Sequence, residues 1–583
     1  MAGMTLHIFT GNAPFYVVAI LAALYLAYSW ALPKPITGIP YDESAKNNVA
    51  GNLPELISML RATGKTRDFF KGMSRNLPCL TPYSPCYKHN SAITQIWMGP
   101  LQKPCLILSD FRESQDILLR RTREFDRGPF STSAFAGVVP NHHIAMSSLD
   151  PRFKGNKELV RDLMTPKFLH EVSAPQIYAK TMALVDLWAL KAKLGEGRPF
   201  NACRDIFDAA IDIINAVAFG LEDDQTTIKN QAKFLSYKSG QRPAINADGT
   251  VDFPELPTLP NITAIEAIGL HLGEQFKTPF PRLMHRIQML ISPTLAKHFT
   301  QKDKFIRDEI DKAVVRLCKD ESGTRSAMDH ILQREMRAAE KAGREPIFHS
   351  PRIHDELFGF LVAGHDTSST AIAWMVKNIA EYPEVQIKLR AALRTAYSEA
   401  HAEGRQPSVV ELWKISVPYL DAVLEESLRY DGPIPITLRE ALIDTVILRH
   451  KIPKGTVVFL LSDGPDYHSP PIPIPEHARS PSSRNRRSWD PSDMHLFKPD
   501  RWLKTTENGN VVYDSQSGPM MAFGLGPRGC FGRRLAYLEI RIVLALLVWN
   551  FEFHKLSDEL SSRDSHDSIT KSPVRCYVSL TKV

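Results

Sequence analysis

The sequence predicts a mainly α-helical protein with a small β-rich region, preceded by an N-terminal apolar helix. Three observations support this fold class: long segments have apolar residues at helical spacing, short β-like runs lie near residues 93–108 and 445–461, and residues 15–32 are uncharged and apolar. The 583 residues are 43% hydrophobic, which is ordinary for a globular protein, and the length permits more than one domain.

The charge and cysteine content exclude some classes of protein. Lysine and arginine exceed aspartate and glutamate by 71 − 64 = 7. This small excess indicates no nucleic-acid partner, although it permits an acidic protein partner. The seven cysteines are scattered and odd in number, so they fit a reducing compartment better than a disulfide framework.

The N-terminus is predicted to hold a single-pass membrane anchor. Phe15 to Leu32 is 18 residues long, close to the ~20 that a helix needs to cross a bilayer. No lysine or arginine precedes Lys34, which disfavours a cleaved signal peptide and places the bulk of the chain in the cytoplasm. We therefore expect a lumenal tail over residues 1–14, an anchor over 15–32, a proline-containing linker over 33–51 and one globular domain over 52–583.

The first part of that domain mixes strands, loops and helices. Ile93–Met98 and Pro104–Leu108 are predicted strands. Residues 130–143 are predicted to form a loop that ends in the pair His142-His143. A solvated pair is favoured over a metal site, because no third ligand lies at useful spacing. Further helices are predicted over 152–169, 174–219 and 282–336, with a break at Pro293.

A long helix is predicted from Arg352 to Tyr382, ended by Pro383. Its middle reads Ala363-Gly-His-Asp-Thr-Ser368. Glycine is permissive, and threonine can hydrogen-bond back to the backbone, so regular helix bonding should weaken here and leave a place for a bound molecule or water. A kink without chemistry is the alternative.

The next segments combine a helix, two strands and a long connection. Glu426 and Arg429 share one face of a predicted helix over 420–430, where such pairs are often mere surface decoration. Strands are predicted over 445–448 and 457–461. Residues 462–493 are rich in proline and then in arginine, which predicts a disordered surface insertion.

Cys530 lies in a glycine-rich loop directly before a predicted helix, Arg533 to Trp549. A helix N-terminus favours negative charge, so the thiol pKa should be lowered and the thiolate retained. The glycines let a flat partner approach the backbone, and Arg528 suits a carboxylate. These features describe a heme pocket. An inert buried thiol is the alternative, and an iron–sulfur or zinc site lacks other cysteines nearby.

The spacing Phe-x-x-Gly-x-Arg-x-Cys-x-Gly closely resembles the heme-binding loop of the cytochrome P-450 superfamily. The central-helix motif and the Glu-x-x-Arg helix occur in the order typical of that family. The resemblance implies the cytochrome P-450 fold and heme b (iron protoporphyrin IX), with Cys530 as the axial iron ligand. The other cofactor-binding residues implied are Arg528 and Arg439, which would contact heme propionates, and Phe523, Gly526 and Gly532.

The resemblance also implies roles for more distant residues. Thr367 would hydrogen-bond oxygen and water, and Asp366 would help to deliver protons. Glu426, Arg429 and Arg501 would form a buried network that supports the cysteine loop. Many relatives carry a Trp-x-x-x-Arg pattern near residue 157, which this chain lacks. Lys157 or Arg161 could take its role, or both could belong to a solvated basic face.

The function implied is that of a heme-thiolate monooxygenase of the membrane-anchored, fungal type, in the endoplasmic reticulum. It would use O2 to hydroxylate or epoxidise a small lipophilic substrate, with secondary metabolites favoured over fatty acids and xenobiotics. Only 583 − 530 = 53 residues follow Cys530. Electrons should therefore come from another protein. The resemblance implies that this partner is NADPH–cytochrome P-450 reductase, with cytochrome b5 as an additional candidate, docked on Arg533, Arg534 and Arg541. A reductase-independent isomerase or dehydratase and a non-catalytic heme sensor are the alternatives.

Overall fold

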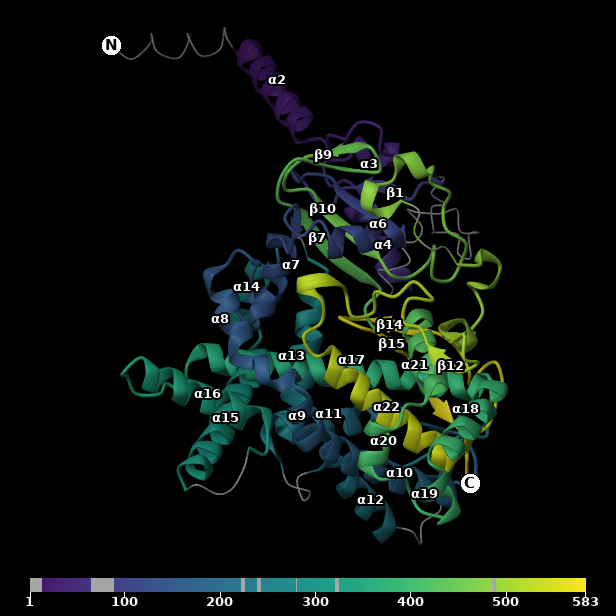
Figure 1. The fold of residues 1–583 in the computed structure, drawn as a ribbon. Coiled ribbons are helices and arrows are strands. Elements are labelled where there is room, and N and C mark those ends of the chain that lie inside the picture. Colours follow the sequence, from purple (N-terminus) through teal and green to yellow (C-terminus); the bar gives the residue numbers. More distant parts are fainter. Residues whose placement is uncertain are drawn as a thin grey trace.

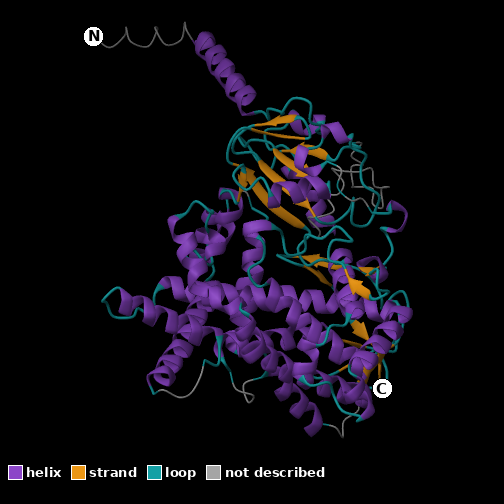
Figure 2. Ribbon diagram, in the orientation of Figure 1, coloured by secondary structure: helices purple, strands orange, loops and turns teal. Residues whose placement is uncertain are grey.

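The computed structural model describes residues 13–63, 89–221, 226–238, 243–278, 280–319, 324–484, 486 and 489–583. Helices form most of the body, and a strand-rich part lies above them in the view of Figures 1 and 2. The predicted mainly α class with a small β-rich region is confirmed. The helices of the described part are α2 Ala13–Ala31, α3 Glu43–Lys46, α4 Leu53–Thr63, α6 Phe111–Leu119, α7 Pro129–Ala136, α8 Pro151–Val160, α9 Pro166–Phe168, α10 Ala174–Leu194, α11 Cys203–Phe219, α12 Thr227–Tyr237, α13 Pro260–Gln275, α14 Pro281–Ile291, α15 Pro293–Cys318, α16 Ala327–Lys341, α17 Pro351–Glu381, α18 Pro383–Ala396, α19 Ser398–Ala402, α20 Val409–Lys414, α21 Pro418–Tyr430 and α22 Arg533–Asn550.

The largest sheet has the strand order β1-β2-β10-β7-β3. The two N-terminal strands pair antiparallel as predicted, whereas β10 runs parallel to β2, with Val458 opposite Leu106. Side chains on β1 and β2 are buried throughout, which suits their apolar sequences. The strands are β1 Ile93–Ile96, β2 Cys105–Leu108, β3 Phe125–Asp126, β4 Phe200–Asn201, β5 Ala244–Ile245, β6 Val251–Asp252, β7 Ile436–Ala441, β8 Thr445–Ile447, β9 His450–Ile452, β10 Val457–Leu461, β11 Leu503–Thr505, β12 Val511–Tyr513, β13 Phe551–Phe553, β14 Ser565–Asp567, β15 Lys571–Pro573, β16 Tyr577–Val578 and β17 Leu580–Lys582.

The long helix α17 crosses the middle of the molecule (Figure 1). Ser350 caps its N-terminus, and the helix ends at Glu381 with Tyr382 as C-cap, directly before Pro383 and one residue earlier than expected. Gly364 lets α11 approach closely, because a Cβ there would lie 2.5 Å from Cδ1 of Ile214. The helix runs unbroken through residues 363–368, so the expected weakening produces no interruption. Thr367 does bond back to the backbone, donating to the Ala363 carbonyl at 2.7 Å.

Helix α2 extends away from the body at the N-terminal end (Figure 1). Every side chain from Phe15 to Trp30 is exposed, and Tyr28 donates a hydrogen bond to the Asn47 carbonyl at 3.1 Å. Within the described residues, no helix is both long enough and apolar enough to cross a membrane. The predicted membrane span is therefore not confirmed and stays a prediction. Residues 1–12 of the predicted lumenal tail lie outside the described part.

Residues 462–493 were expected to be disordered, and for the described residues this expectation is wrong. The segment packs on α6, where the buried guanidinium of Arg479 donates to both carboxylate oxygens of Asp110 at 2.7 and 2.8 Å. Trp489 packs edge-on against Phe111, with ring centroids 5.3 Å apart. The proline- and arginine-rich composition of the segment suggested disorder. It could not reveal these contacts, because they join residues more than 360 positions apart.

We predict that Arg479→Leu will loosen this segment, because it leaves the buried Asp110 carboxylate without its cation. Removing one partner of a buried ion pair costs about 3–5 kcal/mol. Hydrogen exchange of residues 110–119 and 476–484 should accelerate. Arg486→Gln is the control, since Arg486 is exposed in the same segment. Equal protection in both variants would contradict the prediction.

Candidate active site

A cavity of about 470 Å³ lies between α17, the strand-rich part and the loop before α22. This volume is within the range of ligand pockets, roughly 300–1,000 Å³. Cys530 and Thr367 both contribute to its wall. Most other lining side chains are apolar, among them Phe130, Phe135, Ile214, Phe276, Phe360, Ile434, Phe459 and Ile569.

The cysteine loop is held by its own backbone. The Cys530 N–H donates to the Phe523 carbonyl at 2.7 Å, and the Gly529 N–H donates to the Gly526 carbonyl at 3.0 Å. Gly526 has φ +69°, and a Cβ there would lie 2.1 Å from the Leu118 carbonyl oxygen, so only glycine fits. Phe523 and Gly532 line the cavity, whereas Gly526 lies outside its wall and shapes the loop.

Cys530 has the predicted position, two residues before the α22 N-cap Gly532, but not the predicted acidity. Its thiol is open to the cavity, and burial of the surrounding loop nevertheless raises the thiol pKa. The N–H groups of Gly532 and Arg533 and the charge of Arg127 lower the pKa by less than burial raises it. The predicted lowering of the thiol pKa is therefore wrong where the protein groups alone are considered, although a coordinated metal ion deprotonates a thiol outright.

Cations gather on one wall of the cavity without enough anions to balance them. Arg528 donates to the Met146 carbonyl at 2.8 Å, yet its buried Nη1 has no hydrogen-bond acceptor, and Asp126 is 3.9 Å from its Nε. Burial and the charge of Arg528 lower the pKa of Arg127 to about 9 and that of Arg439 to about 10. The described groups on this wall therefore carry excess positive charge, which a bound anion would neutralise.

The structure distinguishes the two candidates near residue 157. Lys157 lines the cavity, and its Nζ lies 3.4 Å from the Pro527 carbonyl oxygen. Burial, followed by the charges of Arg528 and Arg127, lowers its pKa. Arg161 is 62% exposed and pairs with Glu158 at 2.9 Å. Only Lys157 therefore belongs to the cationic wall.

Asp366 and Thr367 occupy different positions relative to the cavity. Thr367 lines it, whereas the Asp366 carboxylate accepts a hydrogen bond from the Thr570 hydroxyl at 3.1 Å. Thr570 is itself part of the cavity wall and also contacts the Thr370 hydroxyl at 3.2 Å. Burial raises the pKa of Asp366, and the charge of His365 opposes that shift.

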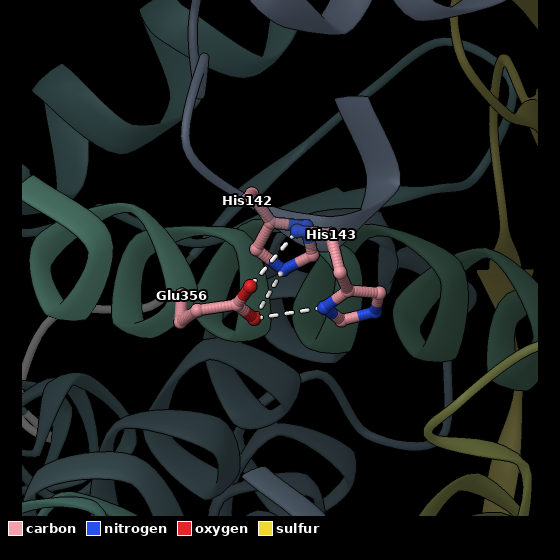
Figure 3. A group of neighbouring side chains, drawn as sticks. All are labelled: His142, His143 and Glu356. Atoms are coloured by element: carbon pink, nitrogen blue, oxygen red, sulfur yellow. Dashed lines mark hydrogen bonds and ion pairs between the residues drawn. The ribbon is translucent and has the colours of Figure 1, made fainter. Parts of the chain in front are cut away.

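The pair His142-His143 is not solvated, so that prediction is wrong. Both rings lie against Glu356 of α17 (Figure 3). His143 Nδ1 is 2.8 Å and His142 Nε2 is 3.4 Å from the same carboxylate oxygen. Burial lowers the pKa of both histidines to about 3 and raises that of Glu356. Helix α7 and a 3-10 turn at His143–Ala145 replace most of the expected loop.

The three side chains include three candidate metal-ligating atoms within 4.8 Å of one another. The hydrogen bonds oppose a metal ion. His142 Nδ1 accepts the Ile144 N–H at 2.9 Å, so in the neutral ring the proton is on Nε2, which faces Glu356. A protonated nitrogen cannot coordinate a metal. We interpret the group as a hydrogen-bonded clamp that holds both rings against α17.

Comparisons with known proteins agree with this geometry. The family model described as Cytochrome P450 matches residues 82–464 and 482–580. The chain belongs to the cytochrome P450 family.

Relatives of this P450 cover nearly its whole length. It is 35% identical to "Cytochrome P450 monooxygenase TRI13" of Fusarium sporotrichioides over 97% of this chain and 98% of that protein. It is 33% identical to "Cytochrome P450 monooxygenase GME11363" of Pestalotiopsis microspora over 99% of both chains. The crystal structure of the "cytochrome P450DA heme domain" has a TM-score of 0.63 at 16% identity, covering 95% of this chain and 97% of that one, which shows the shared fold.

P450 enzymes are heme-thiolate oxidoreductases, and the cofactor of this chain is heme b. The described cavity fits that group. Cys530 offers the thiol ligand, and the unpartnered Nη1 of buried Arg528 lies on a wall suited to propionate carboxylates. Arg127, Lys157 and Arg439 supply further positive charge there.

The predicted supporting residues lie together in this P450. Glu426 accepts hydrogen bonds from Arg429 at 2.8 Å, from Arg501 at 3.1 Å and from the Trp502 indole at 2.9 Å. Burial alone would raise the Glu426 pKa, but the hydrogen bond and charge of Arg429, together with Arg501, leave it lowered. Arg429 is fully buried and also donates to the Leu496 carbonyl at 2.9 Å. The network thus ties α21 to residues 496–502, upstream of the cysteine loop.

Sequence reasoning missed Arg127, Glu356 and Thr570. Arg127 follows a two-residue strand and carries no motif. Glu356 lies 213 positions from His143, and Thr570 lies 204 positions from Asp366. Such contacts leave no periodic signal, so only the fold brings these residues to the site.

We predict that Glu426→Gln will destabilise this P450 by about 3–5 kcal/mol, because two buried guanidinium groups lose their carboxylate. Heme should be lost more readily, measured as transfer to an excess of apomyoglobin together with the unfolding midpoint. Glu384→Gln serves as the control, since Glu384 is exposed on the neighbouring α18. Heme loss at the rate of the unmodified protein would argue against a supporting role.

Proposed function

We propose that this P450 inserts one oxygen atom from O2 into a C–H bond or a double bond of a small lipophilic substrate, with electrons from NADPH delivered by a separate reductase. The observation that carries this proposal is a largely apolar cavity whose wall includes both Cys530 and Thr367. Heme b, bound to the Cys530 sulfur, supplies the oxygen activation when present.

The apolar walls select the substrate class. Phe130 packs edge-on against Phe459, and Phe135 against Phe276, with centroid distances of 6.2 and 5.1 Å. These rings leave few hydrogen-bonding groups for water or a polar ligand. Binding of a lipophilic molecule buries apolar surface and excludes water.

Asp366 is proposed to supply protons to the cavity, and Thr367 is proposed to orient the water that carries them. Because burial raises its pKa, Asp366 can hold a proton inside the protein. The Thr367 hydroxyl lines the cavity within one residue of it and can orient water there. Thr570 bridges the Asp366 carboxylate and the cavity wall. This hydrogen-bonded series, Asp366 to Thr570 at the cavity wall, supports the proposed route for a proton to this side of the site.

The face behind Cys530 is proposed to receive the reductase. Arg533 and Arg534 are exposed at the start of α22. Arg541 is already paired with Asp421 and with the Ile415 carbonyl, so it contributes less to this face than expected. An acidic reductase, or cytochrome b5, would be attracted to the two exposed arginines.

The fungal relatives support a role in secondary metabolism. One of them, 39% identical over 49% of this chain, is named "Hps1-dma1 cluster cytochrome P450 monooxygenase cyp3.1" from Dothistroma septosporum. A gene cluster is the typical setting of a biosynthetic pathway. We therefore propose a biosynthetic intermediate, rather than a fatty acid or xenobiotic, as the substrate.

The exposed apolar side chains of α2 support attachment to the membrane of the endoplasmic reticulum, with the catalytic domain in the cytosol. Phe15, Tyr25 and Trp30 are 77%, 70% and 66% exposed. Such a surface is costly in water and favourable in lipid. The anchor over residues 15–32 and the linker over 33–51 are part of this proposal, as is a lumenal tail over 1–14.

We predict that product formation will require both NADPH and reductase, tested on a lipophilic compound that shifts the Soret band. Thr367→Ala should keep that shift but divert electrons to hydrogen peroxide, while Cys530→Ala should lack the red-shifted ferrous–CO band. Turnover without reductase would instead support an isomerase or dehydratase. An unchanged CO band in Cys530→Ala would exclude this cysteine as the ligand.

We further predict that deleting residues 1–33 will move the protein from the membrane fraction towards the soluble fraction, because it removes the exposed apolar side chains of α2. Fractionation of cell lysates, with the CO spectrum as a test of folding, measures the effect. A correctly folded deletion variant that remains in the membrane to the same extent would refute anchoring by α2.

A further inference from the structure

A second cleft, of about 760 Å³, lies where α2 joins the body. Its walls come from three places: Trp30 and Ala31 at the end of α2, the linker residues that follow them, and two loops of the strand-rich part. Those loops are residues 99–104 before β2 and the segment 449–456, which runs from the turn between β8 and β9 through β9 to the start of β10. Figure 1 shows β9 below the end of α2. The cleft is thus remote in sequence and in place from the cysteine loop.

The charged residues that line this cleft are all basic. They are Lys34, Lys103, Arg449 and Lys451, accompanied by His450, and no aspartate or glutamate is among the described residues that line it. Lys103 donates to the Lys454 carbonyl at 2.8 Å. Lys34, Arg449 and Lys451 are exposed, and no ion pair with a described acidic residue holds them. Concentrated positive charge of this kind attracts an anion.

The turn between β8 and β9 presents one of these cations through an unusual backbone. Ile447 pairs with His450, which leaves Leu448 and Arg449 as a two-residue turn. Both have positive φ, 47° and 69°, a conformation that usually selects glycine or asparagine. Leu101, in the other loop, has φ 57° and is 63% exposed. Apolar and basic side chains are therefore exposed together beside α2.

We propose that this cleft binds the phosphate-bearing headgroup of an anionic phospholipid. The inference rests on the proposed membrane attachment of α2, because a lipid-embedded α2 would place Trp30 and the cleft at the headgroup layer. The four basic side chains complement the headgroup charge, and Trp30 and Leu101 offer apolar contact to the adjoining chain region. An acidic protein would have to share this place with the bilayer, so a lipid is the better fit.

The test uses the full-length heme-loaded protein in phosphatidylcholine nanodiscs doped with spin-labelled phosphatidylcholine or phosphatidylserine. Electron paramagnetic resonance measures the fraction of each label that the protein immobilises. Phosphatidylserine should associate about tenfold more strongly at low salt, since each basic residue near an anionic surface adds to the attraction. The variant Lys34→Gln/Arg449→Gln/Lys451→Gln should lose this preference and keep its CO spectrum.

The matched control is Lys193→Gln/Lys555→Gln/Arg575→Gln, which removes three exposed cations outside the cleft. It should retain the preference for phosphatidylserine. Equal immobilisation of both labels by the unmodified protein would overturn the proposal while leaving membrane attachment intact. Failure to enter phosphatidylcholine nanodiscs would refute the attachment and the headgroup site together.

Two further measurements distinguish a phospholipid from other anionic ligands, namely free phosphate and an acidic protein. Equilibrium dialysis that finds inorganic phosphate bound to the unmodified protein and not to the cleft variant, together with equal immobilisation of both lipid labels, would assign the cleft to free phosphate. Weaker reductase-supported turnover in the cleft variant with an unchanged lipid preference would assign it to an acidic protein. Either result would overturn the lipid assignment.

Discussion

Buried positive charge that the protein itself does not neutralise is the constraint on which the active site depends. Arg528 keeps a guanidinium nitrogen without an acceptor, and the pKa values of Arg127 and Arg439 are lowered to about 9 and 10 because burial disfavours their charge. Folding places these groups together at a cost in free energy. A dianionic cofactor repays that cost, so binding of heme and stability of the fold are linked.

The protein treats its other buried charges differently. Glu426 has Arg429, Arg501 and Trp502 as donors, and Glu356 is enclosed by the clamped histidines. These clusters are satisfied within the chain and support the site from outside it. On the cofactor wall and in the cleft beside α2, by contrast, several described cations lie together with few acidic partners. In a folded protein, unsatisfied charge indicates where a partner binds.

The sequence correctly predicted those parts of the site whose structure depends on residues close together in the chain. The Cys530 loop, the helix after it and the long helix with Asp366 and Thr367 were all placed correctly, because capping, glycine content and helical spacing act over a few residues. The acidity of Cys530 was not, since burial depends on the surrounding fold. Arg127, Thr570 and the ordered contacts of Arg479 depend on residues hundreds of positions away, which composition and periodicity do not encode. The histidine pair was misjudged for the same reason, because its partner is on α17.

The parallel pairing of β10 with β2 has a consequence for biogenesis. Val458 faces Leu106, a separation of 458 − 106 = 352 residues. Contacts of such long range slow folding, because a large loop must close first. While the ribosome is still making the intervening helices, β2 is without its neighbour on that side. A nascent chain therefore exposes an apolar strand edge until β10 has been made, when 583 − 461 = 122 residues remain to be added. A chaperone that shields such edges is therefore valuable for high yield.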